Sequence, residues 1–105
     1  MISRVWYAWT TPDNADSYEA FLLDEIFPAL KSGGHAGLQG IDLFRRPHEG
    51  EVEFMTVIWF ASRSSLRAFA GDSEVAVVAQ KDKDLLSRYD ARVQHYDVRG
   101  HIRLT

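Results

Sequence analysis

The chain has 105 residues, a net charge of −3 and no cysteine. This length is typical of one domain, which we expect to span residues 1–105. The basic residues are scattered instead of forming a patch, which argues against a nucleic-acid-binding protein. The lack of cysteine excludes disulfides, thiolate nucleophiles and thiolate metal ligands.

The amino terminus carries no apolar signal segment with a small-residue cleavage site. No apolar run approaches the roughly 20 residues that cross a bilayer. We therefore predict a cytoplasmic protein with no membrane partner.

The first half of the chain predicts a strand, a helix and a second strand. Residues 2–11 are rich in Val, Trp, Tyr and Thr, as strands are. Apolar residues recur at helical spacing over residues 15–30, where Pro28 predicts a kink or an early end. Residues 38–46 predict the second strand, and the polar residues 46–50 predict a hairpin loop.

The third predicted strand, residues 52–61, is the most informative segment. Alternate side chains of a strand point to opposite faces of the sheet. Both faces of this strand are largely apolar, so both should be covered. A chain of this length has helices enough for one face. We therefore expect the second face to meet another copy of the chain, to line an enclosed apolar cavity, or both.

The rest of the chain predicts a helix over residues 62–70, a short helix over 81–88 and a last strand over 90–98. Residues 72–79 carry no clear pattern. The order β-α-β-β-α-β, with a hairpin and right-handed crossovers, predicts an α+β, ferredoxin-like antiparallel sheet with both helices on one face. Two such sheets packed face to face would form a homodimeric α/β barrel.

Several short motifs spread over nearly the whole chain point to one family. They are Trp9–Pro12 with Asn14–Asp16, Glu25–Leu30, Leu43–Arg46, Trp59–Ser62, Ala76–Val78 and Val93–Tyr96. Together with the predicted architecture, they resemble the antibiotic biosynthesis monooxygenase family of dimeric α/β barrels. The resemblance implies the same fold and the same homodimer.

The family's known activities imply two reactions. Some members oxidise anthrones and quinols with O₂ and without a metal or organic cofactor, and others bind and degrade heme. Heme degraders carry an Asn on the first strand and a Trp on the second helix, and quinol-type members often carry a His near the position of Phe69. Here the first strand has no Asn. We predict a cofactor-independent monooxygenase of a small aromatic or polycyclic phenol. The alternatives are a heme-binding or heme-degrading protein and a non-enzymatic barrel that binds a small ligand.

Three residues are candidates for the catalytic roles. On the last strand, His95 or the neighbouring Tyr96 could take a phenolic proton, and His95 could also ligate heme. The structural alternative for His95 is a hydrogen bond to a nearby carbonyl or carboxylate. Arg45 could bind a phenolate, although a surface role is equally compatible with its position.

The aromatic residues are candidates for the walls of a substrate pocket, because ligand pockets are mostly apolar. These residues are Trp6, Trp9, Trp59, Phe69 and Tyr89. Alternatively, they form the core and the dimer interface. Trp6 and Trp9 face opposite ways, so only one of them can line a given cavity. The histidines are scattered, so we predict no metal site.

Overall fold

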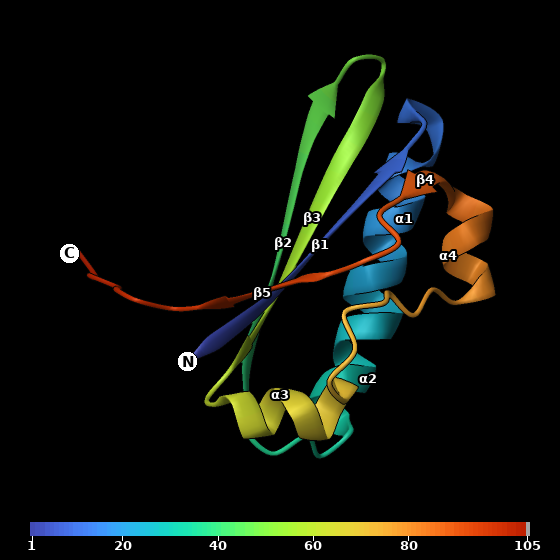
Figure 1. Cartoon of the computed structure of the whole chain (residues 1–105). Helices are drawn as coiled ribbons and strands as arrows, with labels where there is room; N and C mark the ends of the chain where they lie inside the picture. The colour runs from blue at the N-terminus through green and yellow to red at the C-terminus, as the bar shows by residue number, and fades with distance from the viewer. Residues whose placement is uncertain (105) are drawn as a thin grey trace.

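The computed structural model describes residues 1–104, which form one antiparallel sheet with helical segments on one side (Figure 1). The elements in chain order are β1 (Ile2–Thr10), η1 (Pro12–Asn14), α1 (Ala15–Phe21), η2 (Leu22–Ile26), α2 (Phe27–Ser32), β2 (Leu38–His48), β3 (Glu51–Phe60), α3 (Arg63–Ala70), α4 (Gln80–Leu85), β4 (Leu86–Tyr89) and β5 (Gln94–Asp97).

The strands run in the order β2-β3-β1-β4, and β5 pairs with the other end of β1. Along its whole length β1 pairs with β3, from Ile2 opposite Phe60 to Thr10 opposite Val52. On its other edge, β1 pairs first with β4 and then with β5. Together β4 and β5 therefore serve as the fourth strand of a ferredoxin-like sheet. The predicted α+β, ferredoxin-like fold is confirmed.

The first helix continues past Pro28 because of a widened turn. The segments α1, η2 and α2 follow one another without a break, and η2 is a π-helical turn. Phe27 donates its backbone N–H to the carbonyl of Leu22, five residues earlier. Such a turn absorbs the missing donor of Pro28 without ending the helix. No helix within residues 1–104 has both the length and the apolar character needed to cross a membrane.

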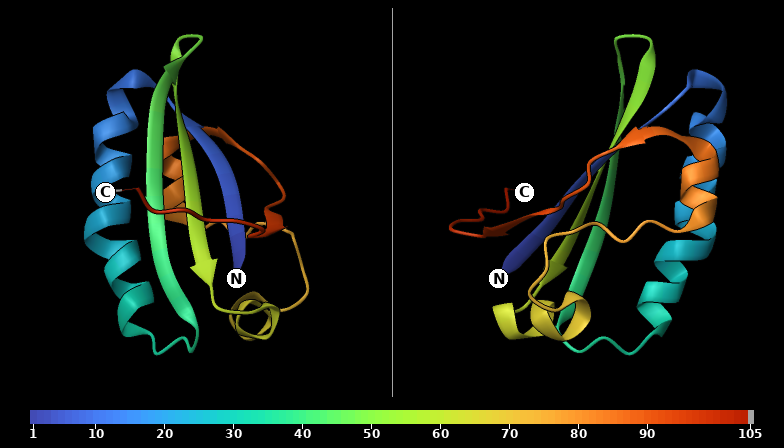
Figure 2. Two further views of the ribbon diagram at one scale, coloured as in Figure 1. Left: turned by 90° about the vertical axis from the view of Figure 1, so that its left-hand side faces the viewer. Right: turned by 45° about the vertical axis from the view of Figure 1, so that its right-hand side comes forward.

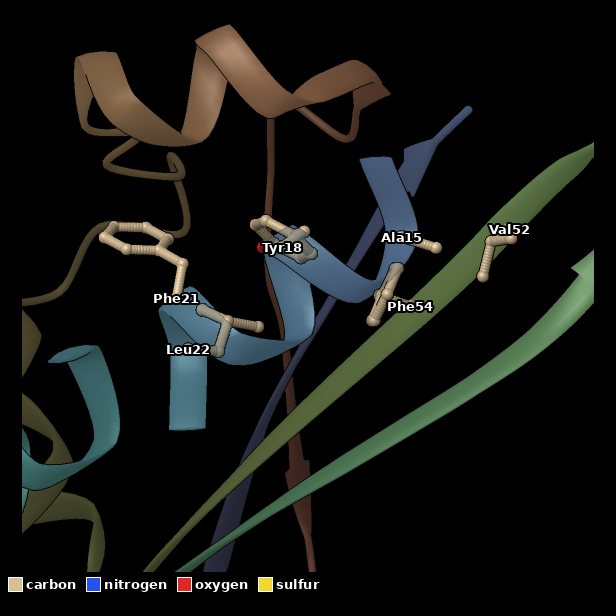
Figure 3. Close-up of a cluster of buried hydrophobic side chains, with 6 residues drawn as sticks. All are labelled: Ala15, Tyr18, Phe21, Leu22, Val52 and Phe54. Carbon is tan, nitrogen blue, oxygen red and sulfur yellow. The ribbon is translucent and has the colours of Figure 1, made fainter. Parts of the chain in front are cut away.

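One end of the core lies between α1 and the sheet. Figure 3 shows Tyr18 of α1 close to Phe54 of β3. Their rings meet edge to face, with centroids 4.9 Å apart. Ala15, Phe21, Leu22 and Val52 complete this buried cluster. At the other end of the sheet, Ile2, Phe60 and Leu66 form a second cluster that fixes α3.

The other face of the sheet, which we call the open face, carries no helix (Figures 1 and 2). The chain after β5 projects away from that side of the sheet, and its Ile102 and Leu104 are exposed. The strand registers place on the open face the apolar and aromatic side chains of Val5, Tyr7, Trp9, Phe44, Met55, Val57, Trp59 and Tyr96.

The predictions for the last elements need correction. The short helix ends at Leu85, not at Arg88, and the next residues form β4. The last strand is confined to β5, because residues 91–93 leave the edge of β1 after Asp90, which still donates to the carbonyl of Tyr7. Val93 donates to the carbonyl of Glu74 at 2.7 Å, and Ala76 donates to that of Ala91 at 2.9 Å. Long-range bonds of this kind leave no pattern in the local sequence.

Replacing Phe54 by Ala should lower the free energy of unfolding by about 3–5 kcal/mol, because a fully buried ring is removed and a cavity remains. Phe54 is 1% exposed. Urea denaturation measures the change. In the matched control Val77→Ala, the side chain is 93% exposed, and the change should stay within about 0.5 kcal/mol. Equal effects of the two substitutions would contradict this core.

Candidate functional site

A cavity of about 690 Å³ lies between the sheet and the helices. This volume is within the range of small-molecule sites. Its walls are mostly apolar. They come from β1 and β3 (Trp6, Ile58), from the long first helix (Leu22, Ile26, Phe27, Leu30), and from α3 and the following loop (Phe69, Ala70, Val75, Ala76, Val77).

The cavity owes one wall to the departure of residues 91–93 from β1. These residues pair instead with the loop after α3, through a bridge between Val75 and Arg92. Val75 and Val93 both line the cavity as a result. The carbonyl of Asp90 accepts from the indole Nε1 of Trp6 at 2.7 Å, which fixes the indole in the opposite wall. The detour of the backbone therefore builds the site and also orients its largest aromatic side chain.

Among the arginines of residues 1–104, Arg4 is the one whose side chain lines the cavity. It shares the helix-covered face of β1 with Trp6 and is half-buried. Its Nη1 donates to Nε2 of His95, 2.8 Å away on β5. Burial lowers the pKa of the guanidinium, and the charge of Glu74 opposes that shift. An arginine remains protonated at physiological pH, so the cavity holds a desolvated positive charge.

Tyr18 and Asp82 bring two further polar groups to the cavity wall. Tyr18 is 1% exposed, and burial, followed by the charge of Asp82, raises the pKa of its phenol well above the ordinary value. Burial also raises the pKa of Asp82, against the opposing effect of its hydrogen bond from the Ala79 N–H. A carboxylate with a raised pKa is a stronger base than a solvated one.

Two of the predicted site residues, Trp6 and Phe69, lie in the cavity wall. Tyr89 lies outside it and packs its ring against Trp6, with centroids 6.0 Å apart. His95 lines a neighbouring cavity of about 50 Å³ and reaches the main cavity only through Arg4. Burial, then the charges of Arg4 and Arg63, lower the pKa of His95, and Glu74 opposes them.

The remaining predicted residues lie away from the cavity. Arg45 pairs with Asp16 at 2.9 Å on the outer surface. Trp9 lies on the open face beneath Arg88, whose guanidinium carbon is 3.8 Å from the ring centroid. Trp59 and Tyr96 share that face, where Trp59 donates to Asp42 and Tyr96 is 56% exposed.

Three polar residues of the cavity were missed by the sequence reasoning. Arg4 had a usable signal, since it is in phase with Trp6 on a strand whose face is otherwise apolar. Tyr18 lies in the apolar stripe of the first helix, where its hydroxyl gives no sign of a cavity. Asp82 resembles any acidic residue near the start of a helix. Within residues 1–104, no three His, Asp or Glu side chains gather as metal ligands would.

Tyr18 should make the stability depend on alkaline pH. Its folded-state pKa is raised, so the neutral phenol favours the native state below the unfolded-state pKa of about 10. This contribution is lost as the pH rises from there through the folded-state pKa. Wild-type protein should therefore lose more unfolding free energy between about pH 9 and 11 than Tyr18→Phe. Urea denaturation at each pH measures the difference, and parallel curves would contradict the assignment.

No protein-family model matches the chain, and no curated protein does. Its structure is similar to that of the heme degrader MhuD from Mycobacterium tuberculosis, solved with two hemes bound in its active site. The TM-score is 0.64 at 16% identity, covering 98% of this chain and 100% of that one.

Two structures assigned to the antibiotic biosynthesis monooxygenases are also similar. The Bacillus cereus protein has a TM-score of 0.60 at 12% identity, covering 99% of this chain and 95% of that one. The Chloroflexus aurantiacus protein has a TM-score of 0.54 at 17% identity, covering 95% of each chain. At these identities the likeness establishes the fold. The resemblance to antibiotic biosynthesis monooxygenases that the sequence motifs indicated is therefore confirmed at the level of the fold.

Proposed function

We propose that the chain is a monooxygenase that oxidises a small aromatic phenol with O₂ in the cavity between sheet and helices. The observation that carries the proposal is the composition of that cavity. Its walls are apolar and aromatic, and they include a carboxylate of raised pKa, Asp82, and a guanidinium, Arg4. A flat apolar ligand with an ionisable hydroxyl fits these walls. The shared fold supports the same reaction class.

In the proposed reaction the cavity removes a proton and excludes water. Asp82 takes the proton of the substrate, and the positive charge of Arg4 favours the resulting anion. The anion gives one electron to O₂, and the radical pair combines to a peroxide. Loss of water from the peroxide leaves a carbonyl, so an anthrone CH₂ and O₂ become C=O and H₂O. Trp6 and Phe69 would hold the ring system between them.

Heme, the alternative considered from the sequence, fits the cavity residues less well. Proteins hold heme iron through His, Cys, Met or Tyr side chains. Within residues 1–104, no histidine lines the cavity, and Nε2 of His95 already accepts from Arg4. Tyr18 does line it, but its raised pKa favours the neutral phenol over the phenolate that would bind iron. We therefore assign no role to heme.

We further propose that two copies of the chain pack open face to open face. The open face is rich in aromatic and aliphatic side chains and carries no helix. Phe44, near the middle of the edge strand β2, is 49% exposed in the single chain. Interface cores are enriched in such side chains. This arrangement would leave the cavity, on the opposite side of each sheet, free to act in each copy.

Asp82→Asn should reduce O₂ uptake with anthrones or quinols about 10²-fold or more, because the amide cannot accept the proton. For the same reason, wild-type activity should fall as the pH drops through the raised pKa of Asp82. The matched control is Asp84→Asn, an exposed residue of the same helix that pairs with Gln80. No uptake above the rate without enzyme would instead favour the non-enzymatic barrel.

Phe44→Asp should convert the dimer to a folded monomer, because the new charge would be buried in the interface but solvated in the single chain. Sedimentation velocity measures the change. Leu23→Asp is the matched control: its side chain is 48% exposed, on the first helix away from the open face. A Phe44→Asp dimer as stable as wild type would rule out this interface.

A further inference from the structure

We propose that the ligand of this cavity is an aromatic hydroxy acid, whose carboxylate pairs with Arg4, and that His95 is the residue that positions Arg4. The inference rests on the proposed function only in taking the cavity as the substrate site. It adds a second ionic group to the substrate, and it gives His95 a positioning role in place of the catalytic one.

Arg4 is a desolvated cation without a direct ion pair, since the charge of Glu74 acts on it only from beyond the ring of His95. Within residues 1–104, no carboxylate forms an ion pair with Arg4, and its side chain donates to the ring of His95. The arginines that do form ion pairs lie at exposed positions; they are Arg45, Arg46, Arg63, Arg67 and Arg88. A half-buried charge is costly unless it is paired. The ligand is the natural source of the missing anion, because Arg4 lines the cavity.

The chemistry of the guanidinium favours a carboxylate. Its N–H groups form a planar fork that can bind both oxygens of one carboxylate. Nη1 is engaged with His95, which leaves the donors of Nη2 and Nε. A phenolate offers one oxygen and uses the fork less completely. The carboxylate therefore matches the free donors better than the hydroxyl does.

His95 holds Arg4 through a defined tautomer. Arginine only donates hydrogen bonds, so Nε2 of His95 must accept from Nη1 and the proton must reside on Nδ1. Nδ1 faces Oε2 of Glu74, 3.9 Å away, and the backbone N–H of His95 also donates to that oxygen. Glu74, His95 and Arg4 thus form a chain that ends at the cavity. Removing the ring would free Arg4 to turn away from the cavity.

The acid and hydroxyl ends of the ligand follow from where the polar groups lie. Arg4 lies opposite Ile58, whereas Tyr18 packs on Phe54, which lies opposite Ala8. Arg4 and Ala8 are four residues apart on β1, roughly 13 Å at 3.3 Å per residue. Asp82 lines the cavity from α4, which contacts α1, the helix of Tyr18, so it lies at the Tyr18 end. A ligand carboxylate at Arg4 would therefore be kept away from the Asp82 carboxylate, and a ligand hydroxyl would meet Asp82.

The test compares a flat aromatic acid with its neutral isostere. The dissociation constants of 2-naphthoate and 2-naphthamide are measured by calorimetry at pH 7. Wild-type protein should bind the naphthoate at least about tenfold more tightly, equivalent to about 1.4 kcal/mol. Under anaerobic conditions, 6-hydroxy-2-naphthoate should bind more tightly than 2-naphthoate, and Asp82→Asn should remove this further gain.

Variants separate the positioning role from a structural one. Arg4→Gln should bring the two dissociation constants within about twofold of each other, whereas Arg4→Lys should keep part of the preference. His95→Leu should lose most of the preference. His95→Gln should restore it, because an amide can accept from Arg4 and donate toward Glu74. Arg88→Gln, on the open face, is the control and should bind both probes as wild type does.

Equal affinity of wild-type protein for the two probes would overturn the inference. So would a preference that survives Arg4→Gln, or the failure of either probe to bind. A His95→Gln variant no better than His95→Leu would overturn the positioning role. Because the preference is measured without turnover, it can hold even if no phenol supports O₂ uptake. That combination would reject the proposed oxidation and keep the assignment of the ligand.

Discussion

The backbone pairing between residues 74–76 and 91–93 is the constraint on which the cavity depends. It draws the chain off the edge of β1 between β4 and β5, so that the fourth strand of the sheet is interrupted. The same bonds satisfy backbone groups that would otherwise be left without partners as the segment leaves the sheet. They also place Glu74 beside His95 and Asp90 beside Trp6. The pairing of residues 74–76 with 91–93 therefore determines both the shape of the cavity and the polar contacts in its wall.

The cavity combines groups that a protein interior does not favour. An apolar space beside a desolvated guanidinium, a buried phenol and a half-buried carboxylate contributes less to stability than a filled apolar core would. Each of these groups keeps at most part of its hydrogen-bonding capacity satisfied within residues 1–104. Their convergence on one space is more readily explained by a ligand than by packing. The open face has the opposite character, since its aromatic side chains are partnered within the sheet or exposed on a surface suited to another protein.

The sequence was sufficient for the parts of the fold that depend on local pattern. Alternation and helical spacing identified the first three strands and both main helices. Pro28 predicted a kink or an early end, whereas the helix continues to Ser32 after the π-helical turn η2. The end of α4 and the broken last strand were not predictable, because they depend on long-range pairing. After α4, β4 pairs with the distant β1, and the break before β5 depends on bonds between residues that lie 15 and 19 positions apart in the chain. The site residues also differ in whether the local sequence pattern could identify them. Trp6 and Phe69 were found from their apolar faces, whereas Asp82 becomes a cavity residue only once α4 packs against α1.

The π-helical turn η2 keeps the cavity-lining side chains of the first helix on one face. In a regular α-helix, side chains four residues apart advance by about 40° around the axis. Three such steps separate Tyr18, Leu22, Ile26 and Leu30, so the last would point well away from the first. All four nevertheless line the cavity, because the wider turn of η2 absorbs part of the drift. If the same residues formed a regular α-helix through η2, Leu30 would lie about 120° around the axis from Tyr18. The helix would survive, but Leu30 would leave the cavity wall.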